Sequence, residues 1–94
     1  MTDEELVSKV VLIADVCGIP KATLASLVGV HRATLYKWLN GERKPHDSQK
    51  RRLGYLSNLF IRAYNDKAFP LKRRGRKATR RIAEEVRQVL RRYS

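Results

Sequence analysis

Cysteine is nearly absent from this 94-residue sequence, since Cys17 is the only one. A disulfide within the chain and a cysteine-rich metal site are therefore excluded, and Cys17 is expected to fill space in the core. A zinc site would need carboxylates that the surroundings of His31 and His46 hardly supply. No metal is expected.

Long apolar runs are also missing. The longest, residues 10–14, is far shorter than the roughly 20 residues that a membrane-spanning helix needs, and the acidic residues at positions 3–5 contradict a signal peptide. The chain has no glycine-rich phosphate loop and no serine, histidine and acid arrangement suited to catalysis. We therefore expect a cytoplasmic protein that is not an enzyme and needs no cofactor.

Positive charge, in contrast, is abundant and unevenly distributed. The net charge is +12; residues 1–30 hold two basic and four acidic residues, a net of −2, so residues 31–94 carry +14. Such an excess suits a polyanion, because neutralising phosphates releases condensed counterions. Nucleic acid is the partner class that this favours, and a basic surface kept only for solubility is the alternative.

Apolar residues recur at helical spacing along most of the chain, so the expected fold class is all-α. Thr2 and Glu5 fit a capping box at the start of the first helix, and Asp47 or Ser48 is expected to cap the fourth. Helices are expected over residues 2–17, 21–28, 32–39, 47–64 and 79–93.

The chain is expected to divide into a domain, residues 1–64, and an appended segment, residues 65–94. The fourth helix closes the core with Leu53, Leu56, Leu59, Phe60, Ala63 and Tyr64. Pro70, Gly75 and a basic run predict a linker without regular structure over residues 65–77. The last helix has an apolar stripe that can fold back on the domain or meet its copy in a dimer: Ile82, Ala83, Val86, Val89, Leu90 and Tyr93.

Residues 21–40 fit a pair of short helices joined by a tight turn. Ala25 permits a close approach of the two helices, and Gly29 suits the turn between them. Asn40 and Gly41, which tolerate left-handed backbone angles best, end the second helix of the pair. The residues expected to face inward are Leu24, Val28, Val30, Leu35 and Trp38.

With Leu35, Trp38 and Leu39 toward the core, the outward face of the helix over residues 32–39 comprises Arg32, Ala33, Tyr36, Lys37 and Asn40. A B-DNA major groove, about 12 Å wide, admits one helix; arginine and lysine suit guanine, and a methyl group suits thymine. The expected base contacts are Arg32, Ala33, Tyr36 and Lys37. An ordinary helical bundle is the alternative for this pattern.

The pattern of Ala25, Gly29, Val30, Leu35 and Trp38, followed by residues 40–45, resembles the lambda-repressor and Cro group, often called the XRE family. The resemblance spans residues 4–64. It implies a lambda-repressor-like bundle of four to five short helices with a helix-turn-helix, in which Arg32, Ala33 and Lys37 read bases while Lys21 and residues 40–44 bind the DNA backbone. Lys21, where glutamine is common, and His31, where a small hydroxyl residue is usual, depart from the family pattern.

Seven of the ten residues at positions 72–81 are basic, which predicts an arm that tracks phosphates or enters a minor groove; a solvated charge run is the alternative. The expected backbone contacts are Lys21, His31, Thr34, Asn40, Arg43, Lys44, Lys72, Arg73, Arg74, Arg76 and Lys77.

These observations predict a sequence-specific double-stranded DNA-binding transcriptional regulator, a repressor or Cro-like protein of a phage or mobile element. A homodimer on a palindromic site is expected, because one recognition helix reads only a few base pairs. The alternatives are an antitoxin-like or RNA-binding module with the same fold, and an architectural protein that binds DNA without sequence preference.

Overall fold

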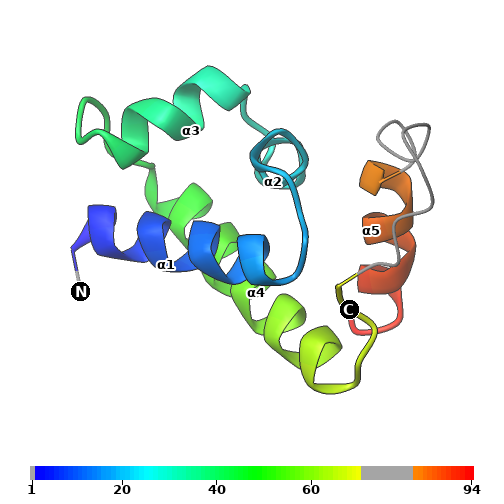
Figure 1. Ribbon diagram of the computed structural model, residues 1–94. Helices are drawn as coiled ribbons and strands as arrows, with labels where there is room; N and C mark the ends of the chain where they lie inside the picture. Colours follow the sequence, from blue (N-terminus) through cyan, green and yellow to red (C-terminus); the bar gives the residue numbers. More distant parts are fainter. Residues whose placement is uncertain (1, 71–81) are drawn as a thin grey trace.

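The computed structural model describes residues 2–70 and 82–94, and this part of the chain is all-helical, with five helices and no strand (Figure 1). The all-α class is thus confirmed. The helices are α1 (Asp3–Val16), α2 (Lys21–Val28), α3 (Arg32–Leu39), α4 (Asp47–Asn65) and α5 (Ile82–Arg91). None of these helices is long and apolar enough to cross a membrane.

The core lies between α1 and α4, which pack against each other, with α2 and α3 closing one side. In Figure 1, α4 crosses α1 obliquely and continues beyond it toward α5. Burying an aliphatic or aromatic side chain of this kind contributes about 1.5–3 kcal/mol before the entropy of ordering is counted. The central side chains, all fully buried, are Val7, Val10, Leu24, Leu35, Leu53, Leu56 and Phe60.

Two helix ends follow the local rules read from the sequence. The Glu5 backbone N–H donates to Thr2 Oγ1 at 3.1 Å, so the predicted cap of α1 is confirmed. Gly29, at φ +91°, ends α2 in the left-handed region. Helix α3 ends at Leu39, directly before Asn40 and Gly41, as expected; Asn40 is the C-cap with a right-handed backbone, and Gly41 is left-handed at φ +75°.

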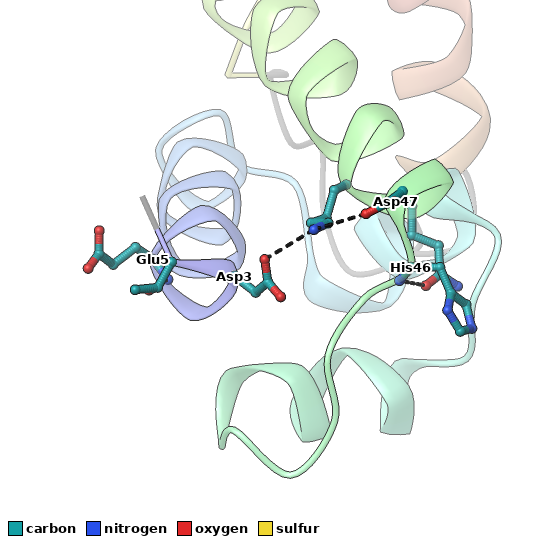
Figure 2. A network of polar contacts seen from close by, with 7 residues as sticks. Asp3, Glu5, His46 and Asp47 are labelled. Atoms are coloured by element: carbon teal, nitrogen blue, oxygen red, sulfur yellow. Dashed lines mark hydrogen bonds and ion pairs between the residues drawn. The ribbon is translucent and has the colours of Figure 1, made fainter.

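The N-terminus of α4 differs from the prediction. The N-cap is His46, and neither Asp47 nor Ser48, both of which lie inside the helix. Gln49 explains the shift, because its Oε1 atom accepts the His46 backbone N–H at 2.7 Å and so satisfies a group left over at the helix start (Figure 2).

Helix α5 folds back on the domain, which selects one of the two arrangements left open by its apolar stripe. Ile82, Val86, Val89 and Leu90 are all buried, and α5 packs against α4. The expected start of this helix at Thr79 lies outside the described residues.

The segment between α4 and α5 connects the two helices and also contributes a residue to the core. Over residues 66–70 it has no helix, as expected, but Phe69 is only 2% exposed and its ring meets Phe60 edge-on, with centroids 6.4 Å apart. Tyr64, expected in the core, is 44% exposed, so that assignment was wrong. Ala63, its neighbour in the same turn, is fully buried as expected.

Cys17 is buried at the C-terminal end of α1, as its apolar surroundings predicted. Burial raises the pKa of its thiol to about 11, because the interior disfavours the thiolate. The thiol is therefore neutral at physiological pH and belongs to the packing.

Candidate nucleic-acid interface

Helix α3 has one buried and one exposed side. Leu35 is 0% exposed and Trp38 2% exposed, and both join the core. Arg32, Ala33 and Lys37 are exposed, as is Tyr36 at 43%. The four residues expected to contact bases therefore share the solvent side of α3, because the two large apolar residues hold the other side against the core.

The start of α3 has an unusual cap. His31 takes the N-cap position, and its Nδ1 atom accepts the Ala33 backbone N–H at 3.1 Å. The imidazole thus takes the role that a small hydroxyl side chain commonly has at a helix N-cap. Its ring is exposed beside the first turn of the helix.

The cations of α3 are not engaged by the protein itself. Within residues 2–70 and 82–94, ion pairs involve only Lys50, so Arg32 and Lys37 have no carboxylate partner. Unpaired exposed cations on a surface without large aliphatic residues suit phosphate and base-edge acceptors.

A further exposed cation lies at the start of α2. Lys21 is the first residue of this helix and is exposed. Pro20 is the N-cap and has no side chain that could accept the first backbone N–H groups. The positive end of the helix dipole and the Lys21 amine therefore reinforce each other at this end of α2.

The loop between α3 and α4 exposes Arg43 and Lys44 and is anchored by the buried Pro45. These two cations border two hollows. One, of about 450 Å³, also includes Asp3 and Glu4. The other, of about 320 Å³, is lined by Thr34, Trp38, Arg43, Lys44, His46 and Gln49 and has no carboxylate. The lining of the second hollow thus has cations and no acid, whereas the lining of the first has both.

His46 and Gln49 belong to this second hollow and were missed as candidate phosphate contacts in the sequence. His46 was considered only as a metal ligand. The available signal was its position, since a polar residue at the start of a helix, directly after a basic loop, is well placed to bind an anion. Thr34, predicted to contact the backbone, is half-buried at the edge of the same hollow.

The loop is framed by a polar network between α1 and α4 (Figure 2). Lys50 Nζ lies 3.4 Å from Asp3 Oδ1 and 3.1 Å from Asp47 Oδ1. Hydrogen bonding to Asp47 and the charge of Asp3 raise the pKa of the Lys50 amine. This pairing holds the start of α1 beside the start of α4, and it partly neutralises acids that would otherwise face the loop.

The remaining predicted contacts divide into two groups. Asn40 is exposed at the end of α3. Lys72, Arg73, Arg74, Arg76 and Lys77 lie outside the described residues.

In the described ranges, 2–70 and 82–94, no group of three histidine, cysteine, aspartate or glutamate side chains is placed to hold a metal ion. Comparison of the chain with known protein families, with curated proteins and with solved structures finds no match.

Proposed function

We propose that this protein is a sequence-specific regulator that binds double-stranded DNA as lambda-repressor and Cro-like helix-turn-helix proteins do, with α3 in the major groove. The observation that carries the proposal is the division of α3, since burial of Leu35 and Trp38 leaves Arg32, Ala33, Tyr36 and Lys37 together in solvent.

Each side chain on that surface has a role that its chemistry allows. Arg32 and Lys37 donate to O6 and N7 of guanine. Ala33 contacts a thymine methyl group, and the Tyr36 hydroxyl reaches a base edge or a phosphate. These contacts supply sequence preference.

Phosphate contacts flank the base-reading surface on two sides. Lys21 binds the backbone at the start of α2, while Arg43, Lys44 and His46 bind it through the hollow beside the α3–α4 loop. Such contacts orient the protein on the duplex and supply affinity that does not depend on sequence. The basic residues at positions 72–77 add to this sequence-independent affinity.

A homodimer forms part of the proposal, but through a surface other than the one the sequence suggested, because the apolar stripe of α5 is buried within the chain. Leu12 (64% exposed), Val16 (51%), Ile61 (40%) and Tyr64 (44%) gather on α1 and α4. We call these four residues the α1–α4 patch.

The α1–α4 patch suits a second copy of the chain. Its four residues, with Ile13 and Cys17, line a hollow of about 250 Å³ that contains no charged side chain. A chain with a net charge of +12 repels its copy wherever cations meet, so an uncharged apolar surface is the favourable place for contact. A two-fold dimer also doubles the contacts on a palindromic site.

Selection of duplexes from a random pool, followed by anisotropy titrations at fixed salt, tests the proposal. The selected duplex should bind about 10³-fold or more tightly than a scrambled duplex of the same composition. Equal affinity for both would support an architectural protein, and preference for RNA would support the RNA-binding alternative.

A further inference from the structure

A hollow of about 320 Å³ lies between α2, α4 and α5, away from the α3 surface. Its floor is apolar and consists of Leu27, Leu56, Leu59 and Leu90, all buried. In Figure 1, α2 stands between α3 and α5. The hollow is therefore built on the opposite side of α2 from the proposed DNA-binding surface.

Three arginines surround this floor, and two of them are held in place. Arg52 donates from Nε to the backbone oxygen of Leu27 at 3.2 Å, and its guanidinium carbon lies 5.5 Å from the centre of the Tyr55 ring. Arg87 donates from Nη2 to Ser26 Oγ at 2.7 Å. Each contact uses one of the five N–H donors of its guanidinium group and leaves the others available.

No carboxylate of the described part of the chain forms an ion pair with Arg52, Arg87 or Arg91. Glu84 lies three residues before Arg87, one turn away on α5, yet Arg87 bonds to a serine of another helix. Arg87 and Arg91 are themselves one turn apart and repel each other. An anion between the three guanidinium groups would relieve this repulsion and accept the free donors.

The apolar floor of the hollow favours an anion with an apolar part over a phosphate of a DNA duplex. A phosphate in the DNA backbone gains nothing from four leucines, whereas a compact apolar body does. The volume is at the lower end of the range found for small-molecule sites. We propose that this hollow is a binding site for a small amphipathic anion, with one phosphate or carboxylate group held by Arg52, Arg87 and Arg91 and an apolar body against the leucines.

The site is independent of the proposed DNA contacts, but its occupant would touch α2. Arg87 joins α5 to Ser26 of that helix, and the ligand would bridge α2, α4 and α5. A ligand that binds only the folded chain raises its thermal stability. Occupancy is therefore measurable without DNA.

The test uses three probes on the full chain by calorimetry and thermal denaturation: phenyl phosphate, inorganic phosphate and phenol. Phenyl phosphate should bind one site per chain at least about tenfold more tightly than either of the others, and it should raise the melting temperature. No saturable binding of phenyl phosphate below about 10 mM, or equal binding of inorganic phosphate, would overturn the assignment.

Matched variants locate the binding. Arg87→Gln and Arg91→Gln should each weaken phenyl phosphate about tenfold, because each removes a charge-assisted contact. Arg51→Gln, on α4, and Arg92→Gln, directly after α5, change exposed arginines outside the hollow and should have no effect. Equal losses in all four variants would mean general charge attraction and refute the site.

A duplex titration of the same variants separates this site from the DNA-binding surface. Arg91→Gln should leave the affinity for a duplex unchanged. A loss as large as that caused by Arg43→Gln would assign the hollow to the DNA backbone and overturn the small-ligand assignment. Circular dichroism confirms that each variant is folded.

Discussion

Lys37 and Trp38 are neighbours in α3 with different surroundings: Trp38 is 2% exposed and packs in the core, whereas Lys37 is in solvent without an ion-pair partner in the described chain. An α-helix turns about 100° per residue, so a buried residue fixes the direction of its neighbours. The proposed base-reading surface follows from this geometry.

Lys37→Ala should relax specificity at one base position. The loss for the preferred base pair should be about 1–3 kcal/mol, because one donor to a base edge disappears while phosphate contacts remain. Anisotropy titrations against the selected duplex and its single-base variants measure this. Lys9→Ala, at an exposed lysine of α1, is the control. A uniform loss across all duplexes would show that Lys37 contacts the backbone.

Arg43→Gln should weaken the selected and the scrambled duplex by the same factor. A phosphate contact releases about one counterion, so the slope of log affinity against log salt concentration should fall by about one. Titrations at four salt concentrations give the slope. Arg92→Gln, directly after α5, should leave the slope unchanged. A loss confined to the selected duplex would contradict the phosphate role.

The sequence predicts the fold best where the structure depends only on neighbouring residues in the chain. The bounds of α2 and α3 agree with the sequence, because Gly29 and Gly41 stop the two helices whatever surrounds them. The exposed side of α3, the proposed base-reading surface, could also be predicted, since the inward positions of Leu35 and Trp38 determine the outward ones.

Features that depend on tertiary contacts could not be predicted. The sequence pattern of the apolar stripe of α5 is the same whether the stripe packs on its own domain or on a partner chain. The burial of Phe69 depends on Phe60, nine residues away, and the exposure of Tyr64 depends on how α4 rotates against α1. The arginine-lined hollow is formed by residues of α2, α4 and α5 together, so no local sequence pattern predicts it.

Two glycines offer a paired test of backbone strain. Gly29 has φ +91° and no atom within 4 Å of an added Cβ, so Gly29→Ala should destabilise the fold by about 1–2 kcal/mol through conformation alone. Gly54 lies inside α4 with equally open space, so Gly54→Ala should stabilise it by about 0.5–1 kcal/mol. Urea denaturation measures both. Changes of the same sign would contradict the assigned geometry.

Leu12→Ser combined with Ile61→Ser should convert a dimer into a monomer. Both residues belong to the α1–α4 patch and are at least 40% exposed, so the folded monomer should lose little stability. Sedimentation equilibrium with and without the selected duplex measures the association. Tyr55→Ser, at an exposed tyrosine of α4 outside the patch, is the control. A double variant that still dimerises would place the interface elsewhere.

The most direct test of the DNA-binding surface is a titration of the isotope-labelled protein with the selected duplex, followed through backbone amide chemical shifts. The account predicts the largest shifts at residues 31–37 of the α3 region, at Lys21 and in the loop over residues 40–46, with small shifts in α5. Large shifts confined to α5 or to the α1–α4 patch, with residues 31–37 unchanged, would contradict it.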